Sequence, residues 1–162
     1  MANAVVNIWP LESQCDKFYG NPRGYSGLAS PNWEAANLTH INAPYGMTYA
    51  GSRVATIRIH RLCADSLLRV LNAIKVAAKG DQKLLDAWGA SVYGGGYNFR
   101  LMRGGNHLSM HAYGCAIDLD PAKHPMSWMS KPFVPQVIKA FTDEGWVNLP
   151  HDRMHFQAAK IG

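Results

Sequence analysis

An aspartate stands in the middle of an apolar segment of the sequence. Asp118 lies in the run GCAIDLD (114–120), whose apolar residues predict a strand. A carboxylate in the protein interior is strongly destabilising unless it is paired, and a metal ion is one such partner. The segment therefore indicates either a buried ligand or, if it lies at the surface, an ordinary turn aspartate.

Two histidines complete a set of donors of the kind that catalytic zinc sites use. His111 precedes Asp118 across a glycine-containing turn, and His155 lies near the C-terminus. Catalytic zinc takes three protein ligands and keeps a fourth position for water. Asp152 is a further carboxylate, close to His155, that could take a proton from that water. The spacing alone leaves open a surface histidine and a turn aspartate, because such pairs also occur by chance.

Two short motifs resemble those of the zinc D-alanyl-D-alanine peptidase family, which includes the L-alanyl-D-glutamate peptidases of phage endolysins. The matching residues are Ser109, His111, Gly114, Ala116 and Asp118 in the first motif, and Asp152 and His155 in the second. The resemblance covers about residues 54–160. It implies an α+β fold with a small antiparallel sheet flanked by helices, Zn²⁺ as the cofactor, and a peptide containing D-amino acids as the substrate.

The resemblance also implies a role for each matching residue. His111, Asp118 and His155 would bind zinc, and Asp152 would be the general base. The family more often has glutamate at the position of Asp152, so the reach of this base is shorter by one methylene. The aromatic pair that often precedes the last histidine of the family is Arg153-Met154 here.

An arginine before the first motif polarises the scissile carbonyl in the family. Arg100 is the best match, and Arg103 is the alternative, because the usual Gly-Tyr-Arg strand is stretched to Gly-Tyr-Asn-Phe-Arg here. Ser109 would form a hydrogen bond near the metal site or bind the substrate.

Other histidines and one cysteine lie close to the motifs without fitting them. We expect surface or supporting roles for His107, His124 and His151, and structural or surface roles for His40 and His60. Cys115 falls on the strand face opposite to Asp118, because side chains alternate along a strand, and we expect it in the core.

The remaining patterns predict an α+β protein rather than a parallel sheet, because helices and short strands do not alternate regularly. Strands are expected at 90–103 (with a bulge or close backbone approach at 94–96), 114–120 and 153–158, and residues 54–60 form either a strand or a lead-in to the next helix. Helices are expected at 62–79, at 81–88 with Asp81 as cap, and at 131–144 with Ser130 as cap.

A single domain of 162 residues is expected, with a catalytic core over 54–160. Residues 1–53 are rich in proline, glycine and asparagine and predict an irregular arm. Its aromatic residues would anchor it on the core, or part of the arm would line a substrate groove.

The composition restricts partners and location. The net charge of +5 favours an anionic cell envelope, and the absence of nucleic-acid motifs argues against a specific nucleic acid. The sparse cysteines Cys15, Cys63 and Cys115 indicate free buried thiols and a reducing compartment. The sequence shows no signal peptide and no stretch of the roughly 20 apolar residues that span a bilayer. We expect a monomer made in the host cytoplasm and released to the cell wall by a holin.

The sequence thus predicts a zinc-dependent peptidase that cuts the stem peptide of peptidoglycan, as an endolysin acting on Gram-negative cell walls. Two alternatives stay open: a cytoplasmic D-Ala-D-Ala dipeptidase or carboxypeptidase, and a binding module that keeps zinc without catalysis.

Overall fold

A four-stranded antiparallel sheet forms the centre of the computed structural model, which describes residues 8–162. Its strand order is β5 (Tyr93–Gly95), β6 (Ala116–Leu119), β8 (Asp152–Gln157) and β7 (Val147–Leu149). All three pairings are antiparallel. The strands predicted near 114–120 and 153–158 are therefore neighbours, although more than 30 residues separate them in the sequence. The observed mixture of helices and small antiparallel sheets agrees with the predicted α+β class.

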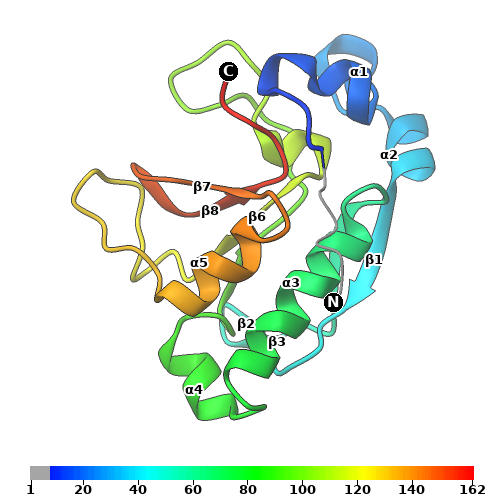
Figure 1. The fold of residues 1–162 in the computed structure, drawn as a ribbon. Helices are drawn as coiled ribbons and strands as arrows, with labels where there is room; N and C mark the ends of the chain where they lie inside the picture. Colours follow the sequence, from blue (N-terminus) through cyan, green and yellow to red (C-terminus); the bar gives the residue numbers. More distant parts are fainter. Residues whose placement is uncertain (1–7) are drawn as a thin grey trace.

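Helices pack beside this sheet (Figure 1). Helix α3 (Ala64–Ala77) lies between α5 (Pro135–Thr142) and strand β1 (Leu38–Asn42). Helix α5 contributes Phe141, whose ring stacks on Phe156 of β8 with ring centroids 3.9 Å apart. Both rings are almost completely buried, so this contact joins the helical layer to the sheet through the core.

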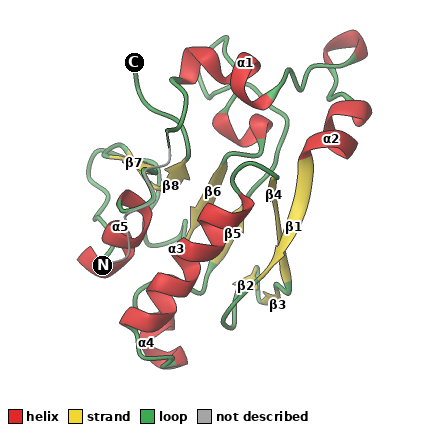
Figure 2. Cartoon of the chain, turned by 45° about the vertical axis from the view of Figure 1, so that its right-hand side comes forward, coloured by secondary structure: helices red, strands yellow, loops and turns green. Residues whose placement is uncertain are grey.

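Residues 8–53 are more regular than their composition predicts (Figure 2), and residues 1–7 of the predicted arm lie outside the described part of the chain. From residue 8 onward the chain forms the short helices η1 (Glu12–Gln14), α1 (Cys15–Tyr19), η2 (Tyr25–Gly27) and α2 (Pro31–Asn37), followed by β1 and the hairpin strands β2 (Thr48–Tyr49) and β3 (Ser52–Arg53). Strand β1 pairs in antiparallel fashion with β4 (Thr56–His60), so the strand is the correct one of the two alternatives for residues 54–60. The prediction of an irregular arm was wrong for this part of the chain.

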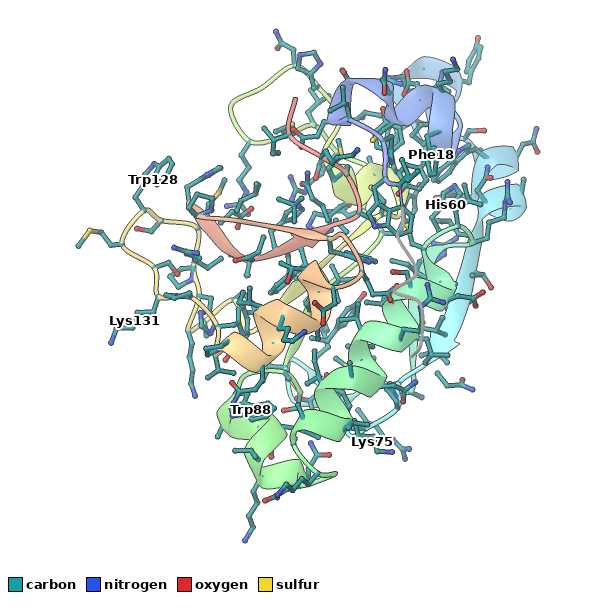
Figure 3. The ribbon with its side chains drawn as sticks, viewed as in Figure 1. Phe18, His60, Lys75, Trp88, Trp128 and Lys131 are labelled. Carbon is teal, nitrogen blue, oxygen red and sulfur yellow. The ribbon has the colours of Figure 1, made fainter. Side chains whose placement is uncertain are left out.

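A proline that looks like a breaker in the sequence instead begins a helix. Pro31 occupies the first turn of α2, where its missing N–H costs nothing, and the hydroxyl of Ser30 accepts a hydrogen bond from the backbone N of Trp33. The expected aromatic anchors are present, because Trp9, Tyr19 and Trp33 are buried against the core. Phe18 is partly exposed at the surface of α1 (Figure 3).

The predicted helices are confirmed at two places and corrected at a third. Helix α3 and helix α4 (Gln82–Ala87) lie where expected, and the Asp81 carboxylate caps α4 by accepting a hydrogen bond from the backbone N of Lys83. The helix expected at 131–144 begins only at Pro135. Val134 is extended because a residue before proline avoids the helical region, so Ser130 caps nothing.

The strand predicted at 90–103 is mostly absent. Only Tyr93–Gly95 forms a strand, and its register against β6 shifts between Tyr93 and Gly95. A Cβ atom on Gly94 would lie 3.1 Å from the Cβ of Asp118, which confirms the expected bulge and close approach. Residues 96–109 form no helix or strand apart from an isolated bridge between Leu101 and Leu108.

The three cysteines of the chain form no disulfide in the described structure. Cys15, Cys63 and Cys115 are free and buried, as expected. Across residues 8–162, no helix has the length and apolar character needed to cross a bilayer.

Candidate metal centre

Pairing of β6 with β8 brings two of the three candidate ligands together. Asp118 of β6 lies directly opposite His155 of β8 in the register of the two strands. His111 comes from the 3-10 turn η3 (Met110–Tyr113), which immediately precedes β6. One ligand atom from each residue can be chosen so that all three lie within 4.8 Å of one another, and within residues 8–162 no other group of histidine, cysteine and acidic residues meets this condition.

The distances between the three ligand atoms are short and nearly equal. Nε2 of His111 lies 3.2 Å from Oδ1 of Asp118 and 3.2 Å from Nδ1 of His155. Nδ1 of His155 lies 3.3 Å from the same Asp118 oxygen. Ligand atoms about 2.0–2.1 Å from a tetrahedral zinc ion would stand about 3.3 Å apart. The three atoms therefore have the spacing that a small metal ion requires.

Hydrogen bonds on the far side of each ring fix which imidazole nitrogen faces the cluster. Nδ1 of His111 lies 2.8 Å from the carbonyl oxygen of Gly96, which can only accept, so this nitrogen carries the proton. Nε2 of His155 lies 2.8 Å from Oε1 of Gln157, which also only accepts. The facing nitrogens of the neutral rings are therefore both acceptors, as is the Asp118 carboxylate. This donor set lacks a proton of its own and fits a metal ion.

The pKa values of Asp118 and His155 are shifted because the two side chains lie so close together. Burial by itself would raise the pKa of Asp118, but the close imidazole rings of His111 and His155 outweigh it and hold this pKa well below its usual range. Burial would lower the pKa of His155, but the Asp118 carboxylate, with smaller contributions from Gln157 and Asp152, raises it. A carboxylate that stays ionised is the form that binds a cation.

Two other residues of the first motif shape the turn that carries His111. The hydroxyl of Ser109 accepts a hydrogen bond from the backbone N of His111 at 3.3 Å, close to the cluster. Gly114 ends the turn with a left-handed backbone, at φ 68°. A Cβ atom there would lie 2.7 Å from Cδ2 of Leu38 and 3.1 Å from the backbone N of His60, so both the conformation and the space require glycine.

A cleft beside the cluster collects the other predicted site residues. Asp152, Arg100 and Arg103 line it together with Ser109 and the three candidate ligands. Arg100 also lines a second hollow, next to Gly94–Asn98, which shares His111 and Asp118 with the first. The structure thus places Arg100 where the two hollows meet and Arg103 on one side only. The chemical roles of these residues stay predictions.

The other histidines lie outside the ligand cluster. His60 is buried beside Tyr19, which makes it structural, and His124 is buried with its ring stacked on Phe133. His151 lines the cleft, and its ring lies 5.0 Å from that of Trp128, which projects outward from the loop between β6 and α5 (Figure 3). His107 lines a separate pocket.

Two residues near the cluster lie outside both sequence motifs. Gln157 contacts His155, and Glu12 contacts Gln157 and lines the cleft. Gln157 could have been found, because it follows His155 by two positions and shares its strand face. Glu12 carries no such signal, because its contact with Gln157 joins positions 145 residues apart.

Comparison with known proteins agrees with the geometry. A family model described as D-alanyl-D-alanine carboxypeptidase matches residues 103–158. This segment contains the three candidate ligands and Asp152, but not Arg100 or Glu12. A search of curated proteins and a search of solved structures each found no match. The family match supports a metallopeptidase that acts on D-alanine-containing substrates. It also suggests that these substrates come from peptidoglycan.

Proposed function

We propose that this protein is a zinc-dependent peptidase that cuts a bond involving a D-amino acid in the stem peptide of peptidoglycan. One observation carries the proposal: Oδ1 of Asp118 and one ring nitrogen each of His111 and His155 converge at 3.2–3.3 Å, while an accepting oxygen lies against the other nitrogen of both rings. Two imidazoles and one carboxylate match the donor set of catalytic zinc sites, which keep one position open for water.

Zinc bound by these residues would supply a Lewis acid that makes water acidic and polarises a carbonyl group. Asp152 begins β8, three positions before His155, and lines the same cleft. Its carboxylate would take a proton from the attacking water and later deliver it to the leaving amine. The guanidinium of Arg100 would stabilise the negative charge that develops on the substrate oxygen.

The shape of the site supports a polymeric substrate over a free dipeptide. Two hollows adjoin the cluster and share Arg100, His111 and Asp118, so a peptide longer than two residues could extend from one hollow into the other. A dipeptidase needs room only for two residues. This arrangement favours an endopeptidase that cuts within the stem peptide, such as an L-alanyl-D-glutamate peptidase.

The biological setting is part of the same proposal. The net charge of +5 suits contact with an anionic bacterial envelope. We place the protein among phage endolysins that act on Gram-negative cell walls after release from the host cytoplasm.

The experiment is digestion of purified Gram-negative peptidoglycan, with new termini identified by mass spectrometry. The zinc-loaded protein should release stem-peptide fragments, and a chelator should stop the release. Asp152→Asn should keep zinc and lose cleavage, because amide nitrogen cannot accept the water proton.

Each other outcome identifies an alternative. Cleavage of free D-Ala-D-Ala without cleavage of peptidoglycan would identify a dipeptidase. A folded, zinc-loaded protein that cuts neither substrate would overturn the peptidase proposal in favour of a binding module.

A further inference from the structure

The second ring nitrogen of His155 is held by a buried glutamine. Gln157 follows His155 by two positions on β8, so both side chains point to the same face. Its side chain is almost fully buried, with 1% of the residue exposed, and its Oε1 lies 2.8 Å from Nε2 of His155. Partners of this kind fix the orientation and the protonated nitrogen of a metal-binding histidine.

The amide of Gln157 is in turn held in one orientation by two acceptors. Its Nε2 donates to Oε2 of Glu12 at 3.1 Å and to the carbonyl oxygen of Ala159 at 3.0 Å. A carboxylate and a carbonyl cannot donate, so the amide nitrogen must face them. The amide oxygen therefore faces His155.

This orientation decides which nitrogen of His155 is free for a metal. Because Oε1 of Gln157 only accepts, Nε2 of the neutral imidazole carries the proton and Nδ1 presents its lone pair to the cluster. If the amide turned over, its N–H would face Nε2. The ring proton would then move to Nδ1, where it would occupy the position of the metal.

The backbone around Glu12 is hydrogen-bonded to the segment that follows β8 of the four-stranded sheet. Glu12 donates its backbone N–H to the carbonyl oxygen of Lys160 at 2.9 Å, and Lys160 donates its own to Pro10 at 2.8 Å. These bonds join the N-terminal arm to the residues that follow β8. Glu12 thus reaches the cleft from a segment outside residues 103–158, the part of the chain that resembles D-alanyl-D-alanine carboxypeptidases.

We propose that Glu12 and Gln157 are positioning residues of the metal centre: Glu12 orients the Gln157 amide, and Gln157 holds His155 with Nδ1 free to bind the metal. This inference rests on the ligand set of the proposed function. It makes the docked N-terminal arm a component of the metal site, so that metal affinity depends on contacts made at residue 12.

The test compares two substitutions at one position. Glu12→Gln keeps an oxygen that can accept from Gln157 and removes the charge, whereas Glu12→Ala removes both. Ser13→Ala is the control, since Ser13 lies in the same turn and does not line the cleft of the metal site. Zinc affinity is measured by competition with a chromophoric chelator. The ring tautomer of His155 is measured by ¹⁵N NMR in the metal-free protein at alkaline pH, where the imidazole is neutral.

We expect Glu12→Ala to weaken zinc binding about tenfold, near the lower end of the range for partners of metal ligands. It should also shift the His155 tautomer away from the form protonated at Nε2. Glu12→Gln and Ser13→Ala should stay close to the wild type in both measurements. Gln157→Leu should weaken zinc binding by about 10- to 100-fold.

Two results would overturn the inference. If Glu12→Gln weakens zinc binding as much as Glu12→Ala, the carboxylate acts by its charge and not by orienting Gln157. If the tautomer of His155 is the same in all variants, Glu12 has no positioning role. A wild-type protein that binds no zinc would instead contradict the proposed function, and the NMR measurement would still decide the role of Glu12.

Discussion

Nε2 of His111 and Nδ1 of His155 face each other at 3.2 Å, although the hydrogen bonds on the far sides of both rings place their protons elsewhere. Two lone pairs at this distance repel each other, and the nearby Asp118 carboxylate adds a third acceptor. A cation at the centre converts this repulsion into attraction. Metal binding should therefore stabilise the fold.

Zinc should raise the melting temperature of this protein by about 5–10 °C when its free concentration is 100 times the dissociation constant. The binding adds about 2.7 kcal/mol under these conditions, and a domain of this size gains roughly 2–4 °C per kcal/mol. Thermal unfolding followed by circular dichroism, with and without a chelator, measures the effect. His155→Ala should abolish the rise, whereas His40→Ala, at an exposed position, should keep it. An equal rise in His155→Ala would place the zinc elsewhere.

Arg100→Ala should lower the turnover of a stem-peptide substrate by about 10²–10³-fold, the usual effect of losing one donor to a developing oxyanion. Arg100 lines both hollows together with His111 and Asp118. Arg103→Ala is the matched comparison, because Arg103 lines only one hollow, and its effect should stay below about tenfold. Steady-state kinetics on zinc-loaded proteins would separate the two. A larger loss in Arg103→Ala would exchange their roles.

The local parts of this site could be predicted from the sequence because their information is local. His111, Gly114 and Asp118 fall within one turn and one strand, so a short motif that resembles a known family was enough to predict that they lie together. The burial of Cys115 followed from the alternation of side chains along the same strand.

The contribution of the N-terminal arm could not be predicted, because tertiary contacts decide it. Strand β1 becomes regular only by pairing with β4, and Glu12 reaches Gln157 only after the arm has joined the end of β8.

Helix α5 begins later than predicted, and the cause is local in the sequence. The position before Pro135 is restricted to extended backbone, and this restriction outweighs the capping preference of Ser130.

Gly114→Ala should reduce the free energy of unfolding by more than Gly104→Ala. Both glycines have a positive φ, 68° and 71°, at which alanine costs about 1–2 kcal/mol. Only at Gly114 does the added Cβ also collide, 2.7 Å from the side chain of Leu38, whereas nothing lies within 4 Å at Gly104. Urea unfolding of the metal-free proteins measures both values. Equal losses would show that the turn before β6 can move to accommodate a side chain.

His60 should make the protein less stable as the pH falls from about 6.5 to about 4. Burial lowers the pKa of His60 to about 4, the hydrogen bond to the Tyr19 carbonyl opposes this, and the charge of Arg61 adds to it. Nδ1 of His60 accepts from the backbone N of Leu62 at 3.1 Å while Nε2 lies 3.0 Å from the Tyr19 oxygen, so a second ring proton would face another N–H. The unfolded chain, with a histidine pKa near 6.5, therefore binds more protons in this window, and stability decreases as the pH is lowered.

The shift corresponds to a loss of up to about 3 kcal/mol between pH 7 and pH 4. Urea unfolding of the wild type and of His60→Gln across this range measures it, since glutamine can donate to Tyr19 and does not titrate. The difference between the two proteins isolates His60 from groups that titrate in both. We expect His60→Gln to be less stable at pH 7 and to lose less stability on acidification, and His40→Gln, at an exposed position, to follow the wild type. If the free energy of unfolding falls equally with pH in His60→Gln and the wild type, the prediction is wrong. The His60 ring would then take up its second proton in the folded protein, with Leu62 moved away.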